Sequence, residues 1–228
     1  MVHVIKISGH ELDQPASLTA LVQTLAAQSG QAVLVHGGGS VLPRALSAIG
    51  GPTNGAAAEY ASMALRGGIN PRLVAALTRH RLQAIGLSGV DLELMYIQPG
   101  DEQPIVRFEV LNYLLEQDWL PVLAPIALDV ATNCGVVLNA DLAAQMVASA
   151  LGADVLTFIV GTPGVFSGGK RITGISARQF ERYIRQGVIE ATYASTVRAA
   201  ALAAPFVGTV RITDIANLAE GVETVVVA

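Results

Sequence analysis

The 228-residue chain is poor in several features that would point to particular classes of protein. Cys134 is its only cysteine, so an internal disulfide bond is impossible. No apolar run approaches the roughly 20 residues of a membrane span, and the N-terminus lacks the basic and apolar regions of a signal peptide. Charged residues make up only 14% of the chain and hydrophobic residues 52%, which permits a large core and argues against disorder. These features predict a cytoplasmic globular protein with no membrane partner.

The charge composition is also uneven. The formal net charge is -4, so we expect no nucleic acid as a partner. Only Lys6 and Lys170 are lysines, whereas the other basic residues are arginines. A scarce residue in an apolar setting deserves a specific explanation, and Lys6 lies in such a setting.

Short β-branched runs alternate with alanine- and leucine-rich stretches, which predicts an α/β fold with a mainly parallel sheet and helices on both faces. One domain of residues 1–228 fits this length. The predicted strands are residues 2–7, 32–35, 84–87, 95–98, 105–108, 121–125, 136–138, 155–160, 209–212 and 224–227. The predicted helices are residues 17–27, 41–48, 56–66, 71–80, 110–117, 140–151, 176–186 and 193–203, with Ser176 as an N-cap, Gly187 as a C-cap and residues 167–170 as a loop.

Lys6 follows an apolar run and is followed by Ser8 and Gly9. An uncompensated lysine is costly to bury, so we expect it near the carboxyl end of its strand, where open α/β sheets bind ligands. A lysine whose ammonium group simply reaches solvent is the alternative interpretation.

Three consecutive glycines, Gly37 to Gly39, follow His36 between a predicted strand and a predicted helix. Their backbone N–H groups could approach an anion closely, and the helix N-terminus adds partial positive charge. A tight turn is the alternative interpretation, and His36 is expected to orient or pack rather than to act as a base.

Three further motifs lie at predicted strand ends or helix starts. Residues 86–89 with Asp91 form another glycine-containing loop, and residues 162–165 form a turn that could hold a nucleotide. Asn139 could cap a helix whose first turn contains Asp141, and Asp141 could also pair with Lys6 or help to bind Mg²⁺.

Taken in this order, the segments resemble the amino-acid kinase family, and within it the acetylglutamate kinases and the related kinases of carrier-protein-linked aminoadipate or glutamate. The resemblance covers most of the chain and implies a three-layer αβα sandwich. The matching segments are residues 4–7, 35–39, 84–91, 121–125, 138–141 and 163–165.

The resemblance implies phosphorylation of the side-chain carboxylate of an N-blocked acidic amino acid, with ATP and Mg²⁺ as cofactors, in a biosynthetic pathway such as that of arginine. About residues 1–134 would hold the substrate and about 135–228 the nucleotide. Lys6 would neutralise the transferring phosphoryl group and Asp141 would orient Lys6. The other implied contacts are Gly38, Gly39 and Asn139 to the substrate and Gly9, Pro163, Gly164 and Lys170 to the nucleotide, with no direct metal ligand.

The chain departs from the family pattern at several positions. Thr196 stands where the family has a second lysine, Val137 replaces an asparagine, and Gly161-Thr162 replaces an aspartate. The substrate-clamping arginine is absent between Gly51 and Ala58. Lys170, in its glycine-rich loop, could supply a replacement cation, and Arg198 is a second candidate, although its position two residues after Thr196 places it on a different helix face.

The sequence is therefore compatible with two functions. The first is an ATP-dependent kinase of a small acidic substrate. The second is a catalytically impaired relative that binds a metabolite or nucleotide or acts as a regulatory subunit. The alanine-rich segment 56–66 is a candidate homodimer surface.

Overall fold

The computed structural model describes residues 1–27, 30–51, 56–101, 103–218 and 220–228. Its central feature is a sheet in which eight strands lie in the order β12-β14-β13-β9-β1-β2-β6-β3 among the described residues. The pairings are parallel except between β13 and β14, which confirms the mainly parallel sheet. The strands are β1 (Val2–Ile7), β2 (Gln31–His36), β3 (Ala84–Ser88), β6 (Leu120–Ala124), β9 (Val155–Ile159), β12 (Gly174–Ser176), β13 (Thr209–Thr213) and β14 (Thr224–Val227).

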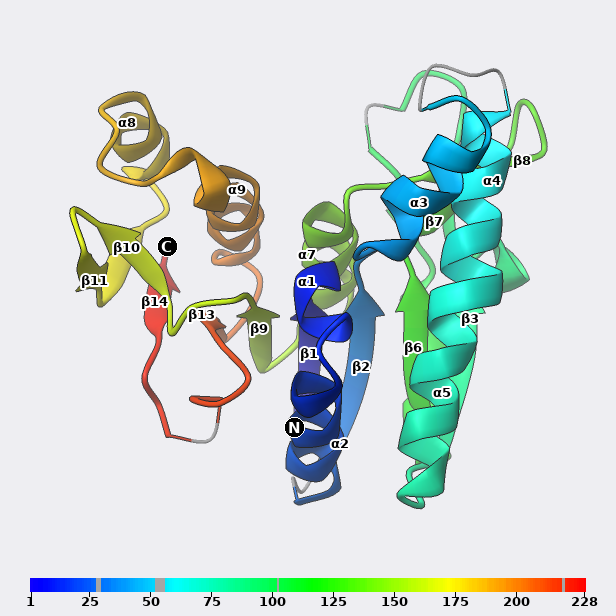
Figure 1. The fold of residues 1–228 in the computed structure, drawn as a ribbon, viewed down its shortest axis with the longest axis horizontal. Helices are drawn as coiled ribbons and strands as arrows, with labels where there is room; N and C mark the ends of the chain where they lie inside the picture. Colours follow the sequence, from blue (N-terminus) through cyan, green and yellow to red (C-terminus); the bar gives the residue numbers. More distant parts are fainter. Residues whose placement is uncertain (28–29, 52–55, 102, 219) are drawn as a thin grey trace.

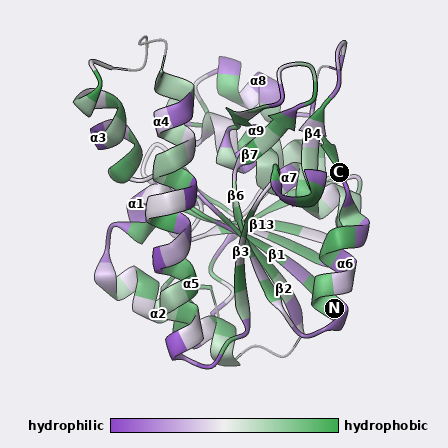
Figure 2. Ribbon diagram, turned by 90° about the vertical axis from the view of Figure 1, so that its right-hand side faces the viewer, coloured by the Kyte–Doolittle hydropathy of each residue, from purple (hydrophilic) through white to green (hydrophobic). Residues whose placement is uncertain are grey.

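Helices cover both faces of this sheet, which confirms the αβα sandwich. Figure 2 shows the fanned strands between α1, α2 and α5 on one side and α6 and α7 on the other. The helices are α1 (Gly9–Leu12), α2 (Pro15–Ala27), α3 (Val41–Ala48), α4 (Ala57–Met63), α5 (Asn70–Arg79), α6 (Phe108–Glu116), α7 (Ala140–Leu151), α8 (Phe180–Arg185) and α9 (Ala194–Ala203), with short helical turns at Ala64–Ile69, Asp91–Glu93 and Ala191–Tyr193.

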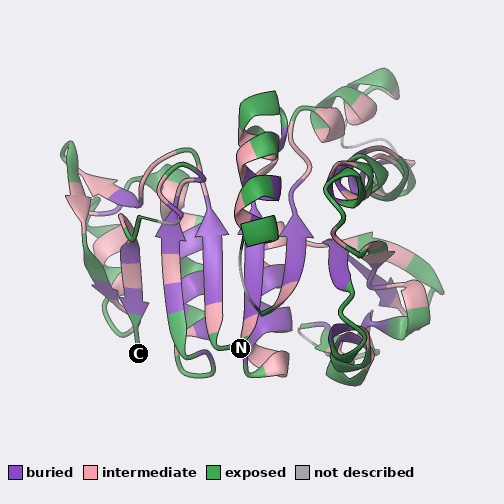
Figure 3. Ribbon diagram, turned by 90° about the horizontal axis from the view of Figure 1, so that it is seen from below, coloured by how far each residue is buried: buried purple, intermediate pink, exposed green. Residues whose placement is uncertain are grey.

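The alternation of side chains along β1 divides the core in two. Val4 packs in a cluster with residues of α6, α7 and α9, whereas Ile5 and Ile7 pack in a cluster with residues of α2 and α5. Buried residues concentrate in the central strands (Figure 3). Successive strand residues point to opposite faces, so Lys6 shares the face of Val4 and points to the α7 side.

Two small sheets complete the fold. β10 (Val165–Ser167) and β11 (Lys170–Ile172) form an antiparallel hairpin. The other small sheet has the order β5-β4-β7-β8, built from Met95–Ile97 (β4), Ile105–Val106 (β5), Ile126–Asp129 (β7) and Cys134–Val137 (β8). The hairpin predicted from residues 95–98 and 105–108 is present as β4 and β5.

Two local predictions are wrong, and a third is made more precise. The two helices predicted over residues 56–66 and 71–80 are one helical segment, because Ala64–Ile69 forms a π-helical turn that carries the helix through Gly67 and Gly68. The loop predicted at residues 167–170 is a tight hairpin turn between β10 and β11, since Gly168 and Gly169 both take positive φ. Ser176 ends β12 instead of capping a helix, and α8 begins only at Phe180.

Helix α1, a single helical turn directly after β1, was not predicted. Ser8 caps it, with its Oγ accepting from the Glu11 N–H. Figure 1 shows α1 beyond the tip of β1. No helix among the described residues is long and apolar enough to cross a membrane.

Candidate functional site

β1 lies at the point where the strand order changes direction. It pairs with β2 on one side and with β9, from the second half of the chain, on the other. In open α/β sheets, the crevice beyond the carboxyl ends of such strands is the preferred ligand site. Lys6 is the penultimate residue of β1, where the sequence predicted it.

Lys6 forms a buried ion pair with Asp141, the second residue of α7. Lys6 Nζ lies 2.7 Å from Asp141 Oδ1, and the two side chains are only 8% and 10% exposed. Two hydroxyls complete the carboxylate's shell, because Ser195 Oγ and Thr196 Oγ1 donate to Asp141 Oδ2 over 3.0 and 3.1 Å. The pairing of Lys6 with Asp141 thus holds geometrically, and the ammonium does not simply reach solvent.

Asn139 fixes the position of Asp141 because it caps the N-terminus of α7, in whose first turn Asp141 lies. Its side-chain oxygen accepts from the Asp141 and Leu142 N–H groups, so it is the N-cap of α7. Its Nδ2 donates to Ser195 Oγ over 3.1 Å, which ties α7 to α9. The cap was predicted; the link to Ser195 was not.

The glycines after β1 and β2 are in direct backbone contact. A Cβ built on Gly9 would lie 1.8 Å from the Gly39 backbone nitrogen, and one on Gly37 would lie 2.7 Å from the Gly9 nitrogen. Gly39 also takes a positive φ of 50°. Only glycine permits this approach, so Gly9 and Gly37–Gly39 form one structure, here called the glycine cradle.

The amides of Gly9, Gly38 and Gly39 have no hydrogen-bond acceptor among the described residues, whereas Gly37 donates to Ile7 O over 3.0 Å. Free N–H groups at such a position can bind an anion. The next amide, of Ser40, is already used: it donates to Asp13 Oδ2 over 2.7 Å, and Ser40 Oγ donates to Oδ1 over 3.1 Å. Asp13 therefore anchors the far end of the glycine cradle.

His36 supports the glycine cradle from below and is fully buried. Its Nε2 lies 3.2 Å from Asn70 Nδ2 and its Nδ1 lies 3.1 Å from Gly37 O. Because an amide nitrogen can only donate, Nε2 accepts and Nδ1 carries the proton. Burial lowers the pKa of His36 from 6.5 to about 4, partly offset by the Gly37 carbonyl. His36 is thus a neutral orienting residue, as predicted, and Gly86 leaves space for Asn70.

The motif of residues 86–91 is a structural loop. Asp91 Oδ2 accepts from Ser88 N and Ser88 Oγ, each over 2.7 Å, and Asp91 Oδ1 pairs with Arg66 Nη2 over 2.8 Å. Gly89 packs against the Ile126 carbonyl, where a Cβ would lie only 2.1 Å away. These contacts fix the loop from β3 to the small sheet.

The turn predicted to contact a nucleotide follows β9. Thr162 Oγ1 donates to Gly164 O over 2.8 Å. Gly164 takes a φ of 119° and leaves room for Thr224, whose Oγ1 accepts from Val165 N over 2.9 Å. Pro163 therefore sits in a turn that its neighbours hold rigidly.

The candidate cations of the second half differ in their surroundings. Lys170 is exposed at the start of β11 and has no ion-pair partner in the described part of the chain. Arg198 pairs with Glu181 over 3.1 Å. Thr196, which the sequence analysis places where the family has a second lysine, contributes a neutral hydroxyl to Asp141. The segment between Gly51 and Ala58, where the family resemblance implies a clamping arginine, includes residues 52–55, which lie outside the described residues.

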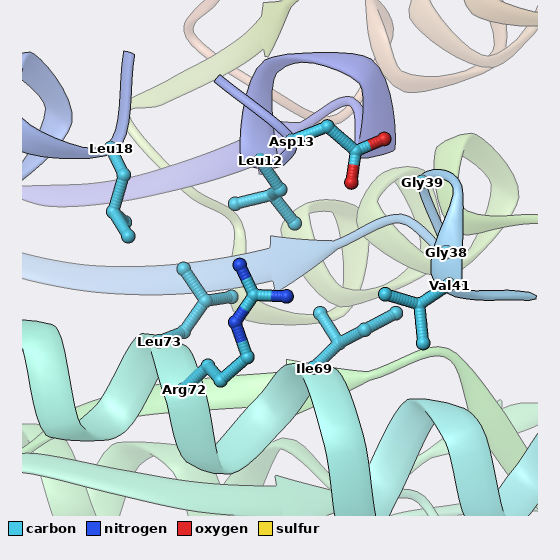
Figure 4. A pocket seen from close by; sticks show the side chains of 9 residues that line it. All are labelled: Leu12, Asp13, Leu18, Gly38, Gly39, Val41, Ile69, Arg72 and Leu73. Atoms are coloured by element: carbon cyan, nitrogen blue, oxygen red, sulfur yellow. The ribbon is translucent and has the colours of Figure 1, made fainter. Parts of the chain in front are cut away.

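A pocket lies on the other side of the glycine cradle, between α1, the start of α2 and α5. Figure 4 shows Arg72 and Asp13 among apolar side chains there. Its cavity volume is about 10 Å³, which leaves room for about one water molecule. It is therefore not a ready metabolite site. The lining residues are Leu12, Asp13, Leu18, Gly38, Gly39, Val41, Ile69, Arg72 and Leu73.

No group of three or more His, Cys, Asp or Glu side chains within the described ranges could hold a metal ion. A Mg²⁺ ion at this site would therefore need ligands from a bound phosphate, as is usual for Mg²⁺.

Comparison with known proteins agrees with this geometry. A sequence model described as the amino acid kinase family matches residues 1–227, and the chain therefore belongs to that family. An acetylglutamate kinase from Chloroflexus aurantiacus is 36% identical, covering 96% of this chain and 94% of the relative. An acetylglutamate kinase from Roseiflexus castenholzii is 37% identical, covering 95% and 91%.

Solved structures share the fold. The crystal structure of smu.665 from Streptococcus mutans has a TM-score of 0.85 at 24% identity and covers 100% of this chain and 98% of the other. Carbamate kinase from Giardia lamblia bound to AMP-PNP has a TM-score of 0.74 at 14% identity, covering 99% and 98%. At these identities the likeness concerns the fold alone.

Proposed function

We propose that this protein is an ATP-dependent phosphotransferase whose acceptor is a carboxylate of a small acidic metabolite. An N-blocked acidic amino acid such as N-acetylglutamate is the first candidate, because relatives named acetylglutamate kinase match the chain over nearly its full length. The observation that carries the proposal is the buried Lys6–Asp141 pair beside the free amides of the glycine cradle.

In the proposed reaction a carboxylate oxygen of the acceptor attacks the γ-phosphorus of ATP, the bond to the bridging oxygen breaks, and ADP leaves. Negative charge on the transferring group is stabilised mainly by positioned cations and N–H donors. Lys6 would supply the cation, and the amides of Gly9, Gly38 and Gly39 would donate to phosphoryl and substrate oxygens. Mg²⁺, when bound with ATP, would neutralise charge on the phosphates.

Asp141 would hold the Lys6 ammonium in place during transfer. Its carboxylate is fixed by Lys6, Ser195 and Thr196, so the ammonium keeps one position without reorganising. Asn139 would serve this arrangement and face the substrate.

The proposal extends to the division of labour along the chain. About residues 1–134 would bind the acidic substrate, and about 135–228, including Pro163, Gly164 and Lys170, would bind the nucleotide. The protein would act in the cytoplasm in an arginine-type biosynthetic pathway. It would be a homodimer formed through α4, where Tyr60 and Met63 are 40% and 59% exposed.

A second candidate is a catalytically impaired family member that binds a nucleotide or metabolite. The observation that favours it is the neutral Thr196 hydroxyl on Asp141, in place of a second lysine. One fewer cation at the site would weaken stabilisation of the transferring phosphoryl group.

An ADP-release assay over a panel of acidic metabolites, N-acetylglutamate first, tests the two candidates. We expect turnover with at least one acid, reduced by about 100-fold or more in Lys6→Met, since one positioned charge donor contributes about that much. Arg79→Met, at the end of α5, is the matched control and should leave turnover unchanged. Lys6→Arg keeps the charge while changing its geometry and guards against loss of folding in Lys6→Met.

Nucleotide binding without turnover on any acid would favour the impaired relative. Turnover that Lys6→Met and Lys6→Arg both leave intact would contradict the role assigned to Lys6.

A further inference from the structure

Glu11 is a largely buried residue at the candidate site, and its carboxylate has no partner among the described residues. It lies in α1, the single helical turn that follows β1, and it is only 7% exposed. None of the ion pairs or side-chain hydrogen bonds in the described part of the chain includes its carboxylate. Its oxygens are not among the fully enclosed, unpaired side-chain atoms of the described residues, so the carboxylate reaches solvent, and the direction in which it points needs an explanation.

Local structure does not provide that explanation. Ser8 and Glu11 have the spacing of a capping box, in which the glutamate side chain would accept from the N–H of the capping serine. Here the Ser8 N–H donates instead to Ile159 O over 3.0 Å, because α1 starts against the end of β9. The Glu11 side chain is therefore free of the capping role and turns elsewhere.

It turns toward the segment that follows β9. A Cβ built on Gly161 would lie 3.7 Å from Glu11 Oε1. Gly161 directly precedes Thr162, Pro163 and Gly164, the turn assigned to the nucleotide in the proposed function. Glu11 thus lies between the strand that carries Lys6 and the turn expected to contact ATP.

A lone carboxylate in this position would repel a triphosphate unless a cation lay between them. Lys6 is already paired with Asp141, and no other ion pair in the described ranges reaches Glu11. Mg²⁺ is typically held by one or two carboxylates together with the phosphates of a bound nucleotide. A single solvent-accessible carboxylate beside the proposed phosphate region meets that requirement without a three-residue cluster.

We infer that Glu11 binds the divalent cation that accompanies the nucleotide, directly or through a water ligand, from the side of Gly161. The inference rests on the proposed binding of ATP and names a residue that the resemblance did not assign. It also explains how Gly161 can stand where the family has an aspartate: the carboxylate comes from α1 instead.

The test measures binding of the nonhydrolysable nucleotide AMP-PNP by calorimetry, with Mg²⁺ and with EDTA, and binding of Mn²⁺ by electron paramagnetic resonance in the presence of AMP-PNP. In the wild type we expect tighter binding with the metal. In Glu11→Gln we expect the metal-dependent gain to fall about tenfold or more, while metal-free affinity is unchanged or higher because a repelling charge is gone. Glu116→Gln, exposed at the end of α6, is the control.

A second variant removes the carboxylate at position 11 and introduces one at position 161, where the family has an aspartate. Gly161 has no positive φ and its Cβ position is at ordinary contact distance from Glu11, so a side chain can be accommodated there. The double variant Glu11→Gln/Gly161→Asp should recover Mn²⁺ binding and the metal-dependent gain.

The outcomes are distinguishable. Equal losses with and without metal in Glu11→Gln, not recovered by Gly161→Asp, would assign Glu11 a structural role and overturn the inference. A full metal-dependent gain in Glu11→Gln would overturn it as well, leaving the proposed function intact. No nucleotide binding by the wild type under either condition would overturn both.

Discussion

The glycine cradle and the contact between α7 and α9 lie on either side of Lys6, yet different forces determine them. In the glycine cradle, backbone atoms of Gly9 and Gly39 are so close that any side chain would collide. At the α7–α9 contact, the neutral hydroxyls of Ser195 and Thr196 hold Asp141 through hydrogen bonds. The glycine cradle requires that its residues have no Cβ, whereas the α7–α9 contact requires only hydrogen-bond donors, which several types of side chain can supply.

This difference explains where the chain follows the family pattern and where it departs from it. A backbone contact tolerates no substitution, so the glycine motif stands intact in the sequence. A carboxylate can be satisfied by a lysine, a hydroxyl or an amide, so Thr196 can replace a lysine without leaving Asp141 unpaired. Charge can also be supplied from another segment, as we infer for Glu11 beside Gly161.

The comparison is tested most severely by Gly9→Ala. The new Cβ would lie 1.8 Å from the Gly39 nitrogen, and backbone on both sides would have to shift. We expect a loss of about 3 kcal/mol in the free energy of unfolding, at the upper end for overpacked sites. Urea denaturation measures it.

Gly67→Ala is the matched control, because nothing lies within 4 Å of its Cβ position and it sits in a helical segment. Alanine should leave stability unchanged or raise it by about 0.5–1 kcal/mol. If Gly9→Ala were as mild as Gly67→Ala, the glycine cradle would not be the rigid structure described.

The support beneath the glycine cradle predicts a smaller, pH-dependent effect. The pKa of His36 is 6.5 when unfolded and about 4 when folded, so between these values the unfolded state binds more protons. The lowered pKa of His36 therefore contributes fully to the free energy of unfolding above pH 6.5, and this contribution is lost as the pH falls toward 4. The loss from pH 7 to pH 5 should be about 2 kcal/mol.

Urea denaturation at the two pH values measures this loss, and His36→Gln should reduce the pH dependence by that amount while lowering stability at pH 7. NMR titration of the imidazole provides a direct reading. A His36 ring that gained a proton near pH 6.5 in the folded protein would contradict the buried neutral assignment.

Much of this molecule was predictable from its sequence. The central strands were predicted from their apolar, β-branched runs, because such residues pack in a buried sheet. The turn at Gly37–Gly39 and the N-cap at Asn139 were predicted from residue types that favour those conformations. The cost of burying a lone lysine predicted that Lys6 lies at the end of its strand, and the family resemblance implied its pairing with Asp141. Glu11 and Asp13 were not predicted, since their spacing fits an ordinary capped helical turn and only the fold brings them to Gly161 and Ser40. The helical passage through Gly67 and Gly68 was missed because glycine pairs usually end helices, whereas here tertiary contacts of Leu65 and Ile69 override that preference.

The smallest expected effect tests the contact between α7 and α9, where side chains can be substituted. Thr196→Val removes the hydroxyl that donates to Asp141 Oδ2 and keeps the shape of the side chain. Lys6 and Ser195 still satisfy the carboxylate, so the free energy of unfolding should fall by about 1.5 kcal/mol, near the lower limit for a hydrogen bond to a charged group. Thr192→Val, exposed in the turn before α9, should change it by less than about 0.5 kcal/mol. A loss in Thr196→Val as large as that in Gly9→Ala would mean that the α7–α9 contact is as intolerant as the glycine cradle, and the explanation for the missing lysine would have to be sought elsewhere.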